Sequence, residues 1–346
     1  MAPENGNLTE FLREADSQPE ALADLIEFYR TEGAPLLTRW RELLAKYSRV
    51  EFIGMGTSEI APLLIRSSLA SAGIGVSIVD AGEYVHYHNA DPAEGTLSVL
   101  ISQSGESAET KKATAALAGQ GAPVAVIVND EDSSMAAAAK LVLPLKAGDE
   151  NSISSKTYLN TLSVLHLMAG GELAELDKVA GTIGRGLDKP AIISAAEHLM
   201  PADSIHFIGR GPALCSAGQL ALTFMEGAQA HGRAFTGGAF RHGPYEVLGP
   251  GHRAVVLAPG GRTVKLCLAM ANEMAGAGSH VVLVTDLDEI EPRENLVVLK
   301  VKNPVGERTF PLAFARVQAW LLHHVARLRG YEAGFLSRVS KVTDVE

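Results

Sequence analysis

The chain carries an internal repeat, and this feature restricts its possible folds more than any other. Residues 50–69, VEFIGMGTSEIAPLLIRSSL, align with residues 205–224, IHFIGRGPALCSAGQLALTF. Residues 96–130 align with residues 252–286 at almost the same offset, so the order and the spacing of the blocks are both retained. The repeat therefore predicts one fold that is used twice.

Within each copy, short runs of β-branched and aliphatic residues alternate with longer segments of helical periodicity. The apolar runs include Val50–Ile53, Ser98–Ile101 and Val124–Val128, and Glu109–Gly119 is one of the helical segments. This alternation predicts an α/β fold in which each copy is a parallel sheet covered by helices. We place an N-terminal helical segment at 1–48, the two copies at 49–195 and 196–330, and a C-terminal tail at 331–346.

The composition excludes several classes of function. The formal charge of −10 and the aromatic content of 5% argue against a nucleic-acid groove, which needs basic stripes and stacking platforms. Cys215 and Cys267 are the only cysteines, which fits two buried apolar residues in a reducing cytoplasm. The sequence starts without a basic region followed by an apolar stretch and contains no run of about 18 apolar residues. We expect a soluble, cytoplasmic protein with a small-molecule partner, no nucleic acid and no membrane.

Two glycine- and serine-rich loops follow apolar runs in the first copy, GMGTSE at 54–59 and SQSGES at 102–107. In parallel sheets, ligands bind beyond the carboxyl ends of the strands, where such a turn opens a helix. Free N–H groups at a helix N-terminus, together with hydroxyl groups, bind phosphate without a lysine. A single serine more often caps a helix, but several polar side chains together favour phosphate binding: Thr57, Ser58, Ser102, Gln103, Ser104 and Ser107. The second copy has APGGRT at the equivalent place, 258–263, so we expect that copy to serve another purpose.

Residues 226–244, EGAQAHGRAFTGGAFRHGP, combine one carboxylate, two histidines and five glycines. A carboxylate and a group that titrates near neutrality are suited to moving protons on a small substrate. From its local sequence alone, Glu226 is equally well explained as an exposed helix residue. His86 and His88 share one face of a segment that we predict to be extended, but no third ligand accompanies them. We therefore expect no metal site.

In this order and spacing, the motifs make the chain resemble the double sugar-isomerase (SIS) domain family, in particular the isomerase half of glucosamine-6-phosphate synthase and the SIS-type glucosamine-6-phosphate deaminases. The resemblance covers nearly the whole chain. It rests on LREADSQPEAL, GTSE, SQSGESAET, ENSISSKTYLNTL at 150–162, FIGRG, FRHGP and the terminal SKVT. It implies two tandem flavodoxin-like SIS domains.

The resemblance also implies a role for each matched position. Glu226 would shuttle the proton, His242 would open the sugar ring in the site of the neighbouring subunit, and Lys341 would close over the sugar and form an imine with its carbonyl. Phosphate and sugar contacts would come from Gly56, Thr57, Ser58, Ser102, Gln103, Ser104, Ser107, Ser154 and Ser155. The shared site implies a homodimer, and the chemistry needs no cofactor. The family also has a histidine at the position of His231, for which we expect a role in shaping the loop.

The chain departs from the family pattern at several points. The glutaminase domain of the synthase is absent, so we do not expect the chain by itself to release ammonia from glutamine. Arg233 stands where the synthase has an acidic residue, and Arg241 replaces a lysine. The stretch 150–158 is one residue shorter than in the synthase. The match of Ser154 and Ser155 to the family's sugar-binding positions therefore depends on where this one-residue gap is placed.

These observations predict an amino-sugar-phosphate deaminase/isomerase that converts glucosamine 6-phosphate to fructose 6-phosphate and ammonia. A fructosamine-6-phosphate deglycase or another aldose–ketose isomerase is the alternative, because its reaction passes through a similar enediol or enaminol. A third hypothesis is a sugar-phosphate sensor that binds without turnover. The retention of Glu226, His242 and Lys341 argues against a sensor.

Overall fold

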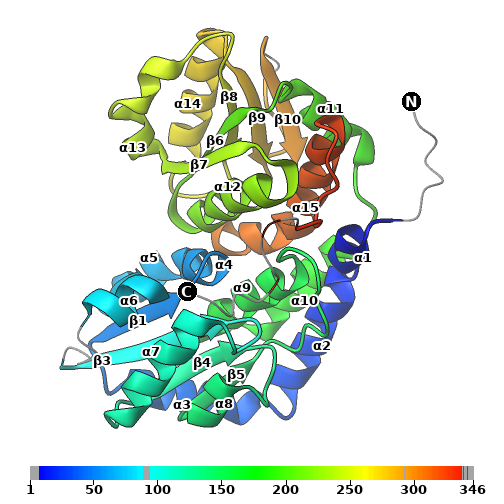
Figure 1. Ribbon diagram of the computed structural model, residues 1–346. Helices are drawn as coiled ribbons and strands as arrows, with labels where there is room; N and C mark the ends of the chain where they lie inside the picture. Colours follow the sequence, from blue (N-terminus) through cyan, green and yellow to red (C-terminus); the bar gives the residue numbers. More distant parts are fainter. Residues whose placement is uncertain (1–7, 89–93, 292, 337, 339–340, 342–346) are drawn as a thin grey trace.

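Each copy of the repeat forms its own five-stranded parallel sheet, and the two sheets lie in separate lobes (Figure 1). The computed structural model describes residues 8–88, 94–291, 293–336, 338 and 341. The rest of the predicted tail, at 337, 339, 340 and 342–346, lies outside the described residues.

The two sheets have the same strand order. The first runs β2-β1-β3-β4-β5 and contains β1 (Arg49–Gly54), β2 (Gly75–Asp80), β3 (Thr96–Ser102), β4 (Val124–Val128) and β5 (Leu141–Pro144). The second runs β7-β6-β8-β9-β10 and contains β6 (Ser204–Gly209), β7 (His231–Thr236), β8 (Arg253–Leu257), β9 (His280–Thr285) and β10 (Leu296–Lys300). This equivalence confirms the predicted α/β fold with two flavodoxin-like halves.

The apolar runs form strands because both faces of each sheet are covered. All seven residues of β3 are buried. Leu97, Val99 and Ile101 enter one core of the first lobe, whereas Leu100 enters the core on the opposite face, as the alternation of side chains along a strand requires. Continuous apolar runs are expected for strands buried on both faces.

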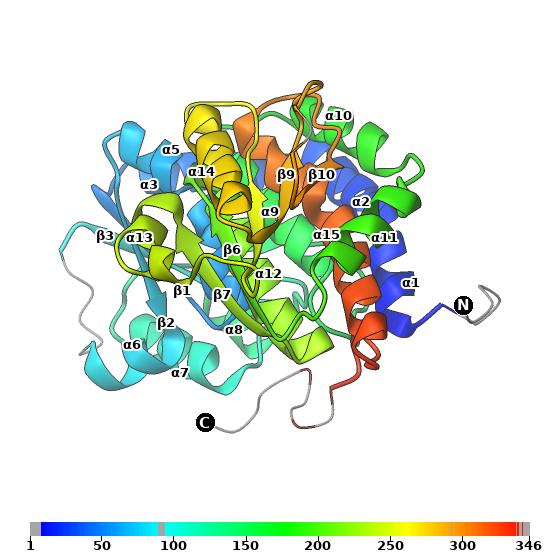
Figure 2. The same ribbon diagram turned by 90° about the horizontal axis from the view of Figure 1, so that it is seen from above.

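Helices cover the sheets on both faces (Figures 1 and 2). The first lobe has α4 (Thr57–Ile60), η1 (Ala61–Leu64), α5 (Arg66–Ser71), α6 (Ala81–Tyr87), α7 (Ala108–Gly119), α8 (Ser134–Ala138), α9 (Lys156–Met168) and α10 (Leu173–Ile183). The second has α11 (Lys189–His198), η2 (Gly211–Ala213), α12 (Leu214–Ala228), α13 (Gly237–Arg241), η3 (Pro244–Val247), α14 (Val264–Gly276), η4 (Glu307–Thr309) and α15 (Phe310–Leu328).

The lobes share side chains across their junction. On α12, Cys215 joins the core of the first lobe, and Phe224 joins the core of the second. On α15, Leu312 belongs to the first core and Phe314 to the second. Both cysteines are free and buried, as predicted. Because each helix contributes to two cores, α12 is held firmly over the loops of the first sheet.

The N-terminal helices α1 (Glu10–Asp16), α2 (Gln18–Arg30) and α3 (Ala34–Leu44) also span the junction. Leu25 of α2 belongs to the first core, whereas Phe11 of α1 belongs to the second. Asp16 accepts hydrogen bonds from Arg316 Nη2 at 2.8 Å and Trp320 Nε1 at 2.9 Å, which ties α1 to α15. In the part of the chain that the structure describes, no helix is both long and apolar enough to cross a membrane.

Candidate functional site

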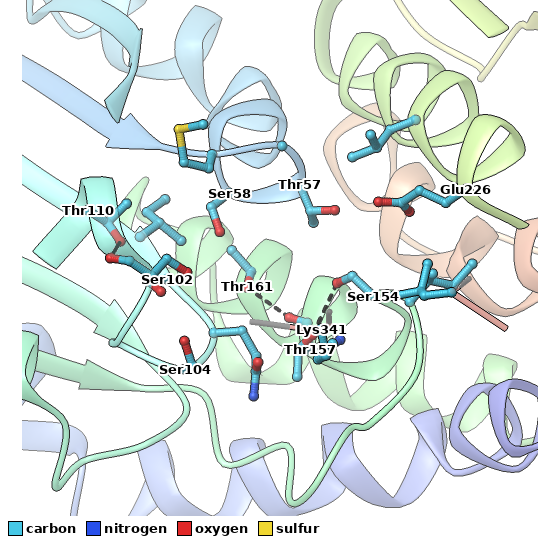
Figure 3. Close-up of a pocket in the computed structure, with 18 residues that line it drawn as sticks. Thr57, Ser58, Ser102, Ser104, Thr110, Ser154, Thr157, Thr161, Glu226 and Lys341 are labelled. Carbon is cyan, nitrogen blue, oxygen red and sulfur yellow. Dashed lines mark hydrogen bonds between the residues drawn. The ribbon is translucent and has the colours of Figure 1, made fainter. Parts of the chain in front are cut away.

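A cavity of about 360 Å³ lies where the loops after β1 and β3 face α12 of the other lobe (Figure 3). The carboxyl ends of these two neighbouring strands meet at one edge of the sheet, which is the usual ligand position in such folds. The cavity is lined by Met55, Gly56, Thr57, Ser58, Ile101, Ser102, Gln103, Ser104, Ser107, Thr110, Ile153, Ser154, Thr157, Thr161, Leu222, Glu226, Leu336 and Lys341.

The loop after β3 presents its serine hydroxyls as donors. Ser102 Oγ accepts the N–H of Gly105 at 3.1 Å, and Ser104 Oγ accepts the N–H of Glu106 at 3.2 Å. Each oxygen thus has a backbone donor, and each hydroxyl hydrogen is left for another acceptor. Ser107 is the N-cap of α7, but its side chain makes no capping hydrogen bond. The arrangement is suited to an anion at the start of α7.

Gly105 is required by the shape of this loop. Its φ is +66°, and an added Cβ would lie 2.1 Å from Ser133 Oγ. No other residue fits there without moving the neighbouring turn.

Gln219 of α12 connects the lobes at the cavity. It is completely buried, and its Oε1 accepts the hydroxyl of Thr57 at 2.9 Å. Its Nε2 lies 3.5 Å from the carbonyl oxygen of Ser154. Gln219 thereby holds the loop after β1 and the loop before α9 against the helix that carries Glu226.

Glu150 organises the loop before α9. Its side chain is fully buried and accepts hydrogen bonds from the N–H and hydroxyl groups of both Ser155 and Thr157, at 2.5 to 3.2 Å. Ser154 Oγ lies 3.1 Å from Thr157 Oγ1. Because the Thr157 hydroxyl donates to Glu150, Ser154 is the donor of this bond.

Lys341 reaches this loop from the tail. Its Nζ donates to Glu150 Oε2 at 2.8 Å and to the carbonyl of Ser152 at 2.5 Å. Glu14 of α1 accepts the N–H groups of Asn151 and Ser152 from the other side of the loop. Burial raises the pKa of Glu14, and the two backbone donors partly offset that effect. The ammonium group is thus held at the cavity wall by a buried carboxylate.

Glu226 lies in the last turn of α12 and faces the hydroxyl-rich loops across the cavity (Figure 3). Burial raises the pKa of its carboxyl group to about 7, against a smaller lowering effect from Lys341. Near neutral pH this side chain exists in both protonation states. It can therefore both accept and return a proton.

The structure brings ten of the twelve predicted site residues to the cavity wall; Ser155 and His242 are the two exceptions. Ser155 is buried, and its hydroxyl is used by Glu150, so it does not face the cavity. His242 ends α13 and is exposed on the surface of the second lobe. Among the described lining residues of this chain there is no histidine.

The sequence interpretation missed several residues at the site. Thr110, Thr157 and Thr161 line the cavity, and Gln219 and Glu150 position its loops. The spacing of Thr157 and Thr161 on one face of α9 is a signal that could have indicated both threonines. Sequence alone gives no such signal for Gln219, whose partner Thr57 is 162 residues away. Glu150 has partners five and seven residues away, but the sequence does not show that its loop folds around a buried carboxylate.

The prediction of an extended segment around His86 and His88 is wrong. Residues 81–87 form α6, which begins because the Asp80 side chain caps it by accepting the N–H of Glu83 at 3.0 Å. No group of three or more metal-ligating side chains occurs within the described ranges.

Comparisons with known proteins agree with this geometry. The model of the SIS domain matches residues 43–170. A glutamine–fructose-6-phosphate aminotransferase from Zymomonas mobilis is 30% identical over 99% of this chain and 60% of its own length. The chain thus spans about three fifths of that relative.

Solved structures extend the likeness to both lobes. The C-terminal domain of glucosamine-fructose-6-phosphate aminotransferase from Francisella tularensis has a TM-score of 0.85 at 23% identity, covering 96% of this chain and 99% of that one. A glucosamine-6-phosphate deaminase from Thermotoga maritima has a TM-score of 0.76 at 18% identity, with coverages of 96% and 99%. Residues 43–170 thus match the SIS domain, and the solved structures show the same fold over both lobes.

Proposed function

We propose that the protein is an amino-sugar-phosphate deaminase/isomerase that converts glucosamine 6-phosphate to fructose 6-phosphate and ammonia. The observation that carries the proposal is the position of Glu226, whose pKa is raised to about 7, opposite a hydroxyl-rich loop in one cavity. The fold and the named relatives support a phosphosugar substrate.

In this proposal the phosphate lies on the loop after β3, where Ser102, Ser104 and Ser107 supply hydroxyl groups at the start of α7. The sugar then extends toward α12. Glu226 takes the proton from C2 and delivers it to C1. The amine nitrogen loses one proton and the C1 oxygen gains one, so the aldehyde becomes a CH2OH group and the amine becomes an imine at C2. Water adds to C2 of that imine. A proton is then transferred to the nitrogen, and the C–N bond breaks to release ammonia and leave the C2 carbonyl of fructose 6-phosphate.

Lys341 stabilises the negative charge that develops on the substrate, or traps its carbonyl as an imine. The ion pair with Glu150 holds the ammonium at the cavity wall before the substrate arrives. Trapping a carbonyl would require Lys341 to lose a proton, which Glu150 is placed to receive.

Ring opening is assigned to His242 of a second copy of the chain. His242 is exposed and does not line the cavity of its own chain. A homodimer that places it at the neighbouring cavity would complete the set of acid–base groups.

A deglycase that acts on fructosamine 6-phosphates is the second candidate. A side pocket of about 350 Å³ adjoins the substrate cavity and shares Glu226 and Leu336 with it. This side pocket offers room for an amino-acid substituent.

The decisive experiment supplies purified protein with glucosamine 6-phosphate and measures ammonia and fructose 6-phosphate. Equal amounts of both products are expected. An amino acid released from a fructosamine 6-phosphate, with no ammonia from glucosamine 6-phosphate, would replace the first candidate with the second.

The rate should depend on pH through Glu226. The proton-accepting form is the carboxylate, so kcat/KM for glucosamine 6-phosphate should rise about tenfold per pH unit below pH 7 and level off above it. A pH–rate profile checks this. The residual rate of Glu226→Gln should lack this inflection, and an unchanged inflection in that variant would assign it to another group.

A further inference from the structure

A second cavity, of about 470 Å³, lies on the other side of the junction and is the internal counterpart of the first. Gly211 lines it at the position equivalent to Gly56, and the two glycines have φ values of +54° and +53°. Ser67 and Ser71 of α5 line it where Leu222 and Glu226 of α12 line the first cavity. The repeat thus builds two cavities, each closed by a helix of the other lobe.

In this second cavity the hydroxyl groups and the carboxylate lie on opposite walls from those that carry them in the first cavity. The loop after β8 has Gly260, Gly261 and Arg262 where the first copy has Ser104, Gly105 and Glu106. A carboxylate sits against this loop: Glu307 accepts the N–H of Arg262 at 3.3 Å. An added Cβ on Gly261 would lie 2.6 Å from Glu307 Cδ. Hydroxyl groups line the facing helix α5 instead, and no carboxylate stands at the position equivalent to Glu226, which is Ser71.

Two arginines supply the positive charge of the second cavity. Arg308 is held in place, with Nε 3.2 Å from His166 Nδ1 and Nη1 3.2 Å from the carbonyl of Ala169. Burial lowers the pKa of His166 to about 4, so the ring is neutral and adds no charge. The guanidinium of Arg262 makes no hydrogen bond or ion pair with the residues that the structure describes. It is available to an anion.

We propose that this second cavity binds a phosphosugar without converting it. The phosphate would be held by Arg262, Arg308 and the serine hydroxyls of α5, and sugar hydroxyls would donate to Glu307. Arginine is well matched to phosphate geometry. Ser71 stands at the position equivalent to Glu226, so no carboxylate faces the ligand from α5. The two carboxylates that line this cavity lie on other walls, where Glu175 contacts His166 and Glu307 accepts the N–H of Arg262. Because its walls come from both lobes, the ligand would stabilise the arrangement that also forms the first cavity.

Calorimetric titration of the full chain with fructose 6-phosphate tests this inference. Two sites per chain are expected. Ser104→Ala should weaken binding at the first cavity, and Arg262→Ala should weaken binding at the second cavity at least tenfold. Lys265→Ala is the matched control, because Lys265 lies at the start of α14, three residues after Arg262, and is outside the cavity wall. Its loss should change the affinity of neither site by more than about twofold.

Saturation at one fructose 6-phosphate per chain would overturn the inference, as would equal effects of Arg262→Ala and Lys265→Ala. This inference goes beyond the proposed reaction, and the two are separable. A protein that releases ammonia but binds one ligand retains the proposed function and loses the second site. A protein that binds two ligands and releases no ammonia retains the second site and loses the proposed function.

Discussion

Glu226→Gln is expected to lower kcat for deamination by about 10²- to 10⁴-fold, the range that a positioned general acid–base contributes. Glutamine has nearly the same shape but cannot accept the proton from C2. The measurement is the rate of ammonia and fructose 6-phosphate formation at saturating glucosamine 6-phosphate. A variant that retains more than about a tenth of the wild-type rate would remove Glu226 from the proton transfer.

The pH dependence of the Tm of the same variant shows whether it is folded. The pKa of Glu226 is raised to about 7 from an ordinary value of 4.5, so the folded state holds this proton more tightly than the unfolded state. Ionisation therefore costs stability progressively as the pH rises from 4.5 to 7, and the cost is constant above that range. Glu226→Gln lacks this cost. Its Tm should exceed that of the wild type at pH 8 and converge with it near pH 4.

Glu150→Ala is expected to destabilise the fold by about 3–5 kcal/mol, because it strips a buried ion pair of one partner. It would leave the N–H groups of Ser155 and Thr157 without an acceptor and Lys341 without its carboxylate. Urea unfolding at constant m-value is the measurement.

Glu131→Ala provides the control for this prediction. Glu131 pairs with Lys146 at the surface, so its loss should cost less than about 1 kcal/mol. Equal effects of the two substitutions would show that Glu150 does not organise the loop before α9.

The fold was predictable because the information is local and repeated. The apolar runs at Val50–Ile53 and Val124–Val128 coincide with β1 and β4, and the repeat gave the strand order of the second sheet once the first was known. The loop after β3 was predictable for the same reason, since its serines follow a strand and precede a helix. The segment around His86 was predicted incorrectly because a cap at Asp80 decided its conformation.

The hydrogen bonds that position the loops of the site were not predictable. Ser155 and Thr157 give their hydrogen bonds to Glu150, and Thr57 gives its hydroxyl to Gln219, a residue far away in the sequence. The pairing of Thr57 with Gln219 depends on how the lobes pack, whereas the pairings of Glu150 depend on how the loop before α9 folds. Neither has a signature in residue spacing. The fact that α12 of one half closes the cavity of the other was equally hidden.

Each cavity is closed by a helix of the other lobe, and this arrangement has a consequence for how the two halves of a duplicated chain can diverge. If the halves were separate, identical subunits related by a twofold axis, every change in one interfacial pocket would appear in the other. Covalent fusion removes this constraint, so Glu226 and Ser71 can occupy corresponding places with different chemistry. Joining two equal units in one polypeptide is thus a physical route to asymmetry, in which one pocket is free to specialise without altering its twin.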